Sequence, residues 1–81
     1  MKFFVYLLRC ADDTLYCGYT TDVARRVAVH NAGKGAKYTR SRLPVVCVYR
    51  EEFATRSEAL AREAAIKKYS RAQKLALLQK S

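Results

Sequence analysis

A chain of 81 residues carries 16 Lys and Arg against 7 Asp and Glu, a net charge of +9, and 51% of it is hydrophobic. This length predicts one domain over residues 1–81, the hydrophobic content argues against disorder, and the charge favours a polyanionic partner, with nucleic acid first and an anionic membrane surface second. Three cysteines without CxxC spacing suggest neither a zinc knuckle nor a disulfide framework, and they favour a reducing, cytoplasmic location.

Residues 2–10 (KFFVYLLRC) are rich in aromatic and branched side chains, which predicts a β-strand. The apolar run stops at an arginine without a cleavage site, so it is not a signal peptide, and it falls short of the ~20 apolar residues of a membrane span. Residues 11–14 (ADDT) predict a turn and residues 15–20 (LYCGYT) a returning antiparallel strand. With a three-residue loop, Tyr6 and Tyr16 would share one face at diagonal positions.

Residues 20–35 (TTDVARRVAVHNAGKG) predict the first helix. Thr21 or Asp22 can cap its start, and Gly33 is suited to end it. Residues 33–42 are then expected to form a basic, glycine-containing loop.

The remaining chain predicts one strand and two helices. Residues 44–53 (PVVCVYREEF) form the strand, Thr55 opens a capping-box helix that runs to about Tyr69, and Ser70 can cap a short terminal helix. The predicted order is β-β-α-β-α-α, an α+β domain with a three-stranded antiparallel sheet flanked by helices.

The two arginines of the first predicted helix are not equivalent. At 100° per residue, Val23 and Val27 form a stripe that faces the core. Arg26 and His30, four residues apart, form a second stripe beside it, whereas Arg25 points to solvent. In the plain structural interpretation, Arg26 covers the edge of the core and His30 is an ordinary surface residue.

The segment just upstream of this helix favours a functional interpretation. Gly18 allows another chain or a ligand to approach the backbone closely. Tyr16 and Tyr19 bring phenolic groups near the helix start, and a helix N-terminus attracts phosphate. Together with Arg26 and His30, these groups predict a phosphodiester site.

The second predicted helix places an acid among apolar residues. Ala59, Glu63 and Ile66 share one face, so the carboxylate of Glu63 needs a partner. That partner is an internal arginine such as Arg26, a divalent metal, or water at the helix edge, and the sequence leaves the three open.

These positions together resemble the GIY-YIG nuclease superfamily over essentially the whole chain, most closely its small stand-alone bacterial members. The first half of the name motif is similar to residues 4–6 (FVY) and the second to residues 16–18 (YCG), ten residues apart from tyrosine to tyrosine. Phe4 replaces the glycine of the first half, and Cys17 the central residue of the second.

The resemblance implies the GIY-YIG endonuclease fold and a set of catalytic roles. Arg26 stands at the position of the family's catalytic arginine, and Glu63 at that of the glutamate that holds a single Mg²⁺ or Mn²⁺. A tyrosine, Tyr6 or Tyr16, would orient or deprotonate the attacking water. His30 can share the role of base, because its intrinsic pKa lies close to neutrality.

Charge and resemblance together imply DNA as the partner, structured or damaged, with RNA left open and no obligate protein partner evident. The residues assigned to nucleic-acid contacts are basic or aromatic: Tyr19, Arg25, Lys34, Lys37, Tyr38, Arg40, Arg42, Lys67, Lys68, Arg71 and Lys74. Tyr38 can in addition stack on an unpaired base.

The leading hypothesis is therefore a metal-dependent endonuclease that acts on DNA in repair or recombination. The alternative is a non-catalytic nucleic-acid-binding module that keeps the fold. A third hypothesis, a protein-interaction adaptor, would not need a net charge of +9.

Overall fold

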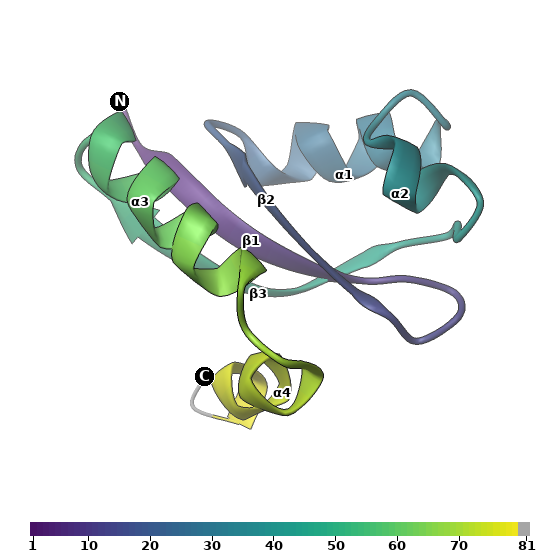
Figure 1. Ribbon diagram of the computed structural model, residues 1–81. Helices are drawn as coiled ribbons and strands as arrows, with labels where there is room; N and C mark the ends of the chain where they lie inside the picture. The colour runs from purple at the N-terminus through teal and green to yellow at the C-terminus, as the bar shows by residue number, and fades with distance from the viewer. Residues whose placement is uncertain (80–81) are drawn as a thin grey trace.

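A computed structural model describes residues 1–79 (Figure 1). The elements in chain order are β1 (Phe3–Arg9), β2 (Leu15–Thr20), α1 (Val23–Asn31), α2 (Lys37–Arg40), β3 (Val46–Phe53), α3 (Arg56–Lys67) and α4 (Arg71–Gln79). The predicted α+β order is confirmed, with the one-turn helix α2 added between α1 and β3.

The three strands form an antiparallel sheet with β1 in the centre, in the order β2-β1-β3. The hairpin register pairs Tyr6 with Gly18 and Leu8 with Tyr16. Tyr6 and Tyr16 therefore lie on the same face at diagonal positions, as the sequence predicted. Because β2 is an edge strand, a side chain of β1 that extends across β2 ends at the edge of the sheet.

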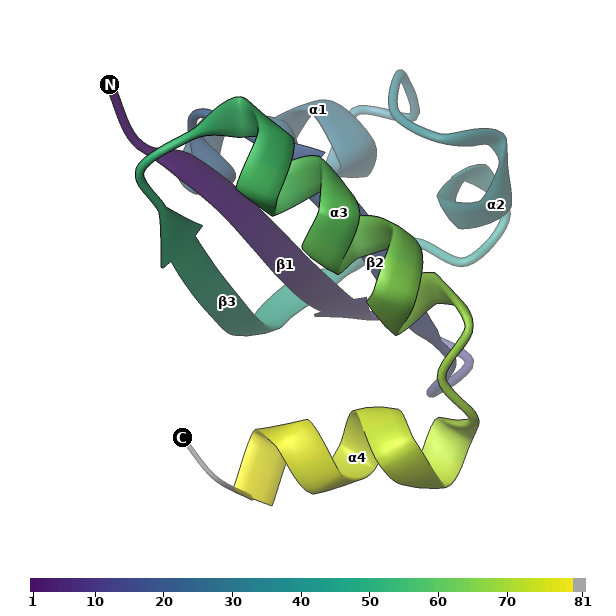
Figure 2. The ribbon, with the colours of Figure 1, turned by 60° about the vertical axis from the view of Figure 1, so that its left-hand side comes forward.

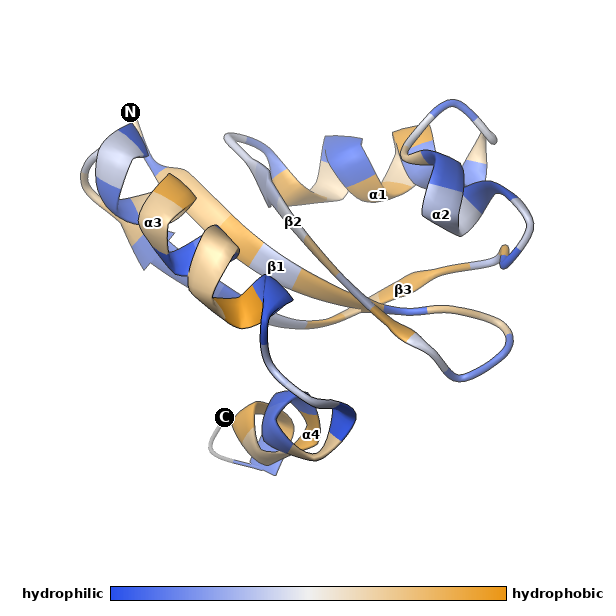
Figure 3. Cartoon of the chain, in the orientation of Figure 1, coloured by the Kyte–Doolittle hydropathy of each residue, from blue (hydrophilic) through white to orange (hydrophobic). Residues whose placement is uncertain are grey.

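The sheet buries a separate core cluster on each face. On one face Tyr6 and Leu8 pack with Val27 of α1. On the other, Val5, Leu7 and Cys17 pack with the apolar residues of α3 and α4: Ala59, Ile66 and Leu77. Figure 2 shows α3 in front of β1 and α1 behind the sheet, and Figure 3 shows the hydrophobic residues running along the central strand.

The helix ends follow the predicted capping chemistry. The Asp22 carboxylate accepts a hydrogen bond from the Arg25 amide at 3.1 Å, which starts α1. Thr55 Oγ1 accepts from the Glu58 amide and so caps α3, and it donates to the Glu58 carboxylate, whereas in a full capping box that carboxylate accepts from the backbone amide of the capping residue. Gly33, with a positive φ of 77°, follows the end of α1.

One local prediction was wrong. The segment predicted as a basic loop contains α2, a single turn with no side-chain cap, which is too short to leave a periodic pattern in the sequence. Of the three free cysteines, Cys10 and Cys17 are buried and Cys47 is exposed.

Within residues 1–79, no helix combines the length and the apolar character that a membrane span requires.

Candidate active site at the edge of strand β2

The ring of Tyr6 crosses the neighbouring strand at Gly18. Tyr6 is 1% exposed, and a β-carbon placed on Gly18 would lie 2.4 Å from the Tyr6 hydroxyl oxygen. Glycine at position 18 therefore provides the space in which the phenol extends over β2. Gly18, the glycine of the second half-motif, lies directly opposite Tyr6 in the hairpin. Its role is therefore steric, because it leaves room for the Tyr6 ring.

The Tyr6 hydroxyl meets a buried histidine. Tyr6 Oη lies 3.1 Å from Nε2 of His30, and Nδ1 of His30 lies 2.9 Å from Oγ1 of Thr39. His30 and Thr39 are both fully buried. The side chain of His30 is therefore not an ordinary surface residue of the helix but a link between Tyr6 and helix α2.

A second glycine makes room for this histidine. A β-carbon on Gly35 would lie 2.3 Å from Nδ1 of His30. The segment that connects α1 to α2 therefore packs its backbone directly against the imidazole, and only glycine fits there. Close approach of backbone to a candidate catalytic side chain thus occurs twice, at Gly18 and at Gly35.

Aromatic contacts extend from this pair toward the surface. The ring of Tyr16 packs edge-on against His30, with 5.5 Å between centroids, and stacks on Tyr38 at 5.8 Å. The Arg42 guanidinium lies 4.0 Å from the centre of the Tyr38 ring. A nucleic-acid base that stacked on Tyr38 would therefore compete with Arg42 for the ring.

Charged residues of two helices, one on each face of the sheet, influence the pKa of the Tyr6 hydroxyl. Burial raises the pKa of Tyr6 to about 12, while a hydrogen bond and the positive charge from Arg26 of α1 oppose this rise. The negative charge of Glu63, on α3, adds to the rise. One phenol is thus within the electrostatic reach of the predicted catalytic arginine and the predicted metal-binding glutamate.

Glu63 lies where the helical periodicity predicted, between the fully buried Ala59 and Ile66. Its side chain is 19% exposed and its carboxylate pairs with Nζ of Lys67 at 3.4 Å. Arg26, one of the partners considered for Glu63 from the sequence, does not form an ion pair with it. A lysine one turn along the same helix takes that place.

The histidine is held in its neutral form. Burial lowers the pKa of His30, and the positive charge of Arg26 lowers it further. A neutral imidazole has one nitrogen that can accept a proton, which is what a general base requires.

The donor set permits a divalent cation that is shared with a substrate. Within residues 1–79, no group of three or more His, Cys, Asp and Glu side chains is arranged to hold a metal. Glu63 offers one partly exposed carboxylate. Mg²⁺ is usually held by one or two carboxylates together with waters and phosphate oxygens. The single carboxylate of Glu63 therefore fits an ion of this kind, and not one enclosed by protein ligands alone.

Most residues predicted to contact nucleic acid lie on the surface, but they are not equivalent. The exposed members of the set are Arg25, Lys34, Lys37, Tyr38, Arg40, Lys67, Lys68 and Arg71. Tyr19 lies instead on the face covered by α3, where it stacks on Phe3 at 6.4 Å. The alternation of the strand therefore separates Tyr19 from Tyr16.

A shallow hollow runs along β2 between α2 on one side and α3 and α4 on the other. The part next to Tyr16 measures about 290 Å³, and a neighbouring part that shares lining residues measures about 180 Å³. Their lining residues are Thr14, Leu15, Tyr16, Cys17, Tyr38, Lys67, Arg71 and Lys74. A larger hollow of about 600 Å³ lies between α1 and β3, but it contains none of the predicted catalytic residues.

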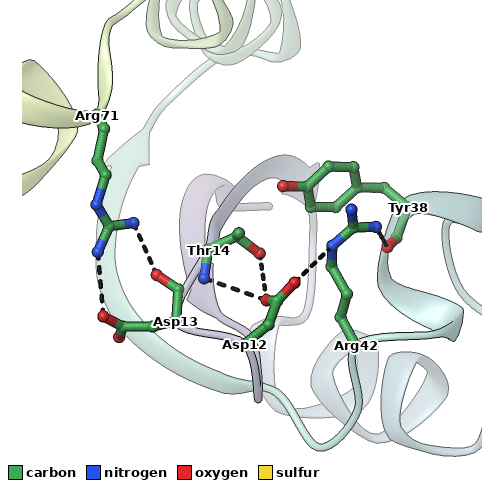
Figure 4. A network of polar contacts seen from close by, with 6 residues as sticks. All are labelled: Asp12, Asp13, Thr14, Tyr38, Arg42 and Arg71. Carbon is green, nitrogen blue, oxygen red and sulfur yellow. Dashed lines mark hydrogen bonds and ion pairs between the residues drawn. The ribbon is translucent and has the colours of Figure 1, made fainter.

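The β1–β2 turn fixes the two sides of this hollow (Figure 4). Asp12 accepts a hydrogen bond from Arg42 Nε at 3.0 Å, and hydrogen bonds from Thr14 and then the charge of Arg42 lower the pKa of Asp12. Asp13 binds Arg71 of α4 through its carboxylate at 3.1 Å and its carbonyl at 2.7 Å. The turn thereby connects the α2 segment and α4.

Sequence reasoning missed Thr39 and Gly35. Nothing in the local pattern distinguishes Thr39 from other hydroxyl residues in a basic segment, because its role depends on a contact nine residues back along the chain. Gly35 did offer a signal, since a glycine close to a candidate catalytic residue can mark a close approach of backbone.

Comparisons with known proteins identify the family of the chain. The model of the GIY-YIG catalytic domain family matches residues 2–76. The UPF0213 protein of Staphylococcus haemolyticus is 56% identical over 78 residues, which cover 96% of this chain and 95% of that protein. The UPF0213 protein of Halobacterium salinarum is 62% identical over 73 residues, which cover 90% and 95%.

Two solution NMR structures have a similar fold, and both are 46% identical in sequence. The UPF0213 protein BH0048 from Bacillus halodurans has a TM-score of 0.63, with coverage of 98% of this chain and 84% of that one. The protein EF2693 from E. faecalis has a TM-score of 0.66, with coverage of 99% and 85%. On the family match and on these relatives, the chain belongs to the GIY-YIG family, whose catalytic domains are in general endonucleases that act on nucleic acid.

Proposed function

We propose that this protein is a metal-dependent endonuclease that hydrolyses phosphodiester bonds of DNA at the edge of β2, in repair or recombination in the cytoplasm. The observation that carries the proposal is that the Tyr6 hydroxyl meets the buried His30 at 3.1 Å, while charges of Arg26 and Glu63, from helices on opposite faces of the sheet, act on the same hydroxyl. Binding alone needs positive charge and has no use for a carboxylate in a basic surface.

Arg26 is proposed to bind the scissile phosphate. Its guanidinium keeps its charge at any physiological pH and presents planar donors that match the non-bridging oxygens. These donors stabilise the charge that builds up on the phosphoryl group in the transition state. Arg25, exposed on the outer side of α1, is proposed to contact the backbone elsewhere.

Tyr6 and His30 are proposed to act together as the base. With a pKa of about 12, only about one Tyr6 phenol in 10⁵ is ionised at pH 7, so a free phenolate is a poor candidate. The neutral His30 at 3.1 Å offers the phenolic proton a destination. Tyr16 is more exposed than Tyr6 and contacts His30 through its ring, so Tyr16 is the second candidate for orienting the water.

In the proposed step, the attacking water gives a proton to Tyr6 Oη as the phenolic proton passes to His30 Nε2. The water oxygen forms a bond to phosphorus, and the bond from phosphorus to the leaving sugar oxygen breaks. That oxygen takes a proton from solvent, and His30 returns its extra proton by the reverse path, to Tyr6 Oη, which passes its own proton to a water that replaces the attacking one. Tyr6 is neutral before and after the step, which avoids a buried phenolate.

Glu63 is proposed to hold a single Mg²⁺ or Mn²⁺ with the substrate phosphate. Such an ion, when bound, supplies positive charge to the phosphate and the leaving oxygen. The Lys67 ammonium 3.4 Å from the carboxylate would then be released from Glu63 and could pair with the polyanion instead.

The hollow along β2 supports a single nucleic-acid strand as the bound species. Its walls carry the positive side chains of Lys67, Lys74 and Arg71 beside the aromatic ring of Tyr38. Positive charge and an aromatic ring are the two features with which proteins bind single strands without regard to sequence.

The test is to incubate the purified protein with branched, single-stranded and duplex DNA and with RNA, in Mg²⁺, Mn²⁺ or chelator. We expect cutting of branched DNA that requires metal and stops on chelation. Salt-sensitive binding without cutting on any substrate would reject the enzyme and select the binding module, and cutting of RNA alone would reject DNA as the substrate.

A further inference from the structure

The hydroxyl of Thr39 lies between two polar groups inside the protein. Thr39 Oγ1 is 2.9 Å from the carbonyl oxygen of Ala36 and 2.9 Å from Nδ1 of His30. Thr39 and His30 are both fully buried, so water does not complete these contacts. The direction of each hydrogen bond follows from the number of protons available.

A hydroxyl has one proton, and a carbonyl oxygen can only accept. If Thr39 donated to His30, its oxygen would face the Ala36 carbonyl oxygen at 2.9 Å with no hydrogen between them, which is repulsive. Thr39 therefore donates to Ala36, whose carbonyl has a second lone pair for the Thr39 amide at 3.1 Å. Nδ1 of His30 must then be the donor to Thr39.

We propose that Thr39 is a positioning residue that holds His30 in the tautomer with its proton on Nδ1. In that tautomer Nε2 is bare and faces the Tyr6 hydroxyl at 3.1 Å, so Tyr6 donates to it. The tautomer follows from the buried geometry alone. Its catalytic consequence, a destination for the phenolic proton, rests on the proposed function.

The fold holds this arrangement from both ends. Gly35 lets the backbone before α2 pass so close to His30 that a β-carbon there would lie 2.3 Å from Nδ1. Gly18 likewise fixes the path of the Tyr6 ring. The imidazole thus has its two nitrogens directed at two different partners, and a ring flip would exchange carbon for nitrogen at both.

Removing only the hydroxyl of Thr39 should allow His30 to adopt the other tautomer. Thr39→Val keeps the branched shape and leaves Nδ1 without an acceptor. The proton can then sit on Nε2, which would donate to Tyr6 and leave the phenolic proton without a destination. Thr39→Ser keeps the hydroxyl, and Thr21→Val makes the same chemical change at an exposed position outside the site.

The direct test is the ¹⁵N NMR spectrum of the imidazole at pH 8, which reports which nitrogen carries the proton. His30 is the only histidine in the chain, so its signals need no assignment. We expect a protonated Nδ1 and a bare Nε2 in the wild type, Thr39→Ser and Thr21→Val, and a mixed or reversed pattern in Thr39→Val. A wild-type proton on Nε2 overturns the proposal, and this spectrum decides even if Thr39→Val does not fold.

The second readout is single-turnover cleavage of bound DNA. We expect Thr39→Val to be slower by about 10- to 100-fold, by analogy with the loss of a group that orients a metal-bound histidine. Thr39→Ser and Thr21→Val should stay near the wild-type rate. If the wild type cuts and Thr39→Val cuts equally fast with an unchanged tautomer, the proposal fails. If no protein cuts, the proposed function fails, while the tautomer stands or falls on the spectrum.

Discussion

At Gly18 and Gly35, the side chain of another residue fills the space that a β-carbon would need. At Gly18 that side chain is the phenol of Tyr6, and at Gly35 it is the imidazole of His30. Both positions therefore control where a proposed catalytic group lies. A methyl group added at either one must push the ring or the backbone aside.

Gly18→Ala should lower the free energy of unfolding by about 1–3 kcal/mol, because the added carbon would lie 2.4 Å from the Tyr6 hydroxyl oxygen. It should also slow cleavage by displacing Tyr6. Urea denaturation and a cleavage assay measure the two effects. Gly33→Asn is the matched control, because no atom lies within 4 Å of a β-carbon there and asparagine tolerates a positive φ. Equal stability of Gly18→Ala and the wild type would contradict the steric role.

His30 should make the protein less stable as the solution becomes acidic. Its pKa is lowered in the folded state, mainly by burial, so below the ordinary value of about 6.5 the unfolded chain takes up the proton first. The free energy of unfolding should therefore fall on going from pH 7.5 to pH 5.5, by up to about 1.4 kcal/mol per pH unit. His30→Gln should remove this slope, and urea denaturation at several pH values measures it. A variant with the wild-type slope would show that another group titrates.

At the scale of elements, the turns and caps made much of the fold predictable. The hairpin, the Asp22 and Thr55 caps and the position of Glu63 followed from local chemistry and periodicity, and the structure contains them all. The hairpin register was predicted only on the condition of a three-residue loop. Helix α2 and the burial of His30 did not follow. Both depend on the packing of one segment against another, which no local pattern encodes.

Helix α3 is joined to β3 by a partly buried ion pair. Arg62 donates to both carboxylate oxygens of Glu51, at 2.8 and 3.0 Å, and Tyr49 also donates to that carboxylate. Hydrogen bonds from Arg62 are the main reason that the pKa of Glu51 is low. Because Glu63 belongs to the same helix, this pair helps to set where the proposed metal ligand lies.

Arg62→Met should destabilise the fold by about 1–3 kcal/mol, since it leaves the Glu51 carboxylate partly buried without its cation. Lys2→Ala removes the pair with Glu52, whose side chains are 70% and 53% exposed, and should cost less than about 0.5 kcal/mol. Thermal denaturation of both variants measures the difference. Equal losses would mean that the Arg62 pair is no stronger than a surface contact.

At the scale of the whole molecule, the net charge of +9 favours a polyanionic partner, and the hollow along β2 is the proposed place for a nucleic-acid strand. The composition of the chain predicted a polyanionic partner but not where on the surface it would bind. The location depends on Asp12 and Asp13, two acids that attach basic residues from distant segments to one turn. The sequence marked these acids only as turn formers.

Lys74→Ala should weaken DNA binding and reduce the dependence of the binding constant on salt. Lys74 lines both parts of the hollow, so its loss should lower the slope of log K against log salt by about 0.7–0.9 for one phosphate contact. Lys2→Ala, outside the hollow, should leave the slope unchanged. Fluorescence anisotropy between low and moderate salt measures both, and equal slopes would place the strand elsewhere.

The central claim is that Tyr6, Arg26 and Glu63 form one metal-dependent hydrolytic site. The most direct measurement is the single-turnover rate of cutting bound DNA in Mg²⁺ by the wild type and by Glu63→Gln, with the affinity of each for the same DNA. Because glutamine keeps the shape but not the charge of the ligand, we predict a rate lower by at least about 100-fold with an affinity within about 2-fold. Cutting by Glu63→Gln at the wild-type rate would contradict the claim.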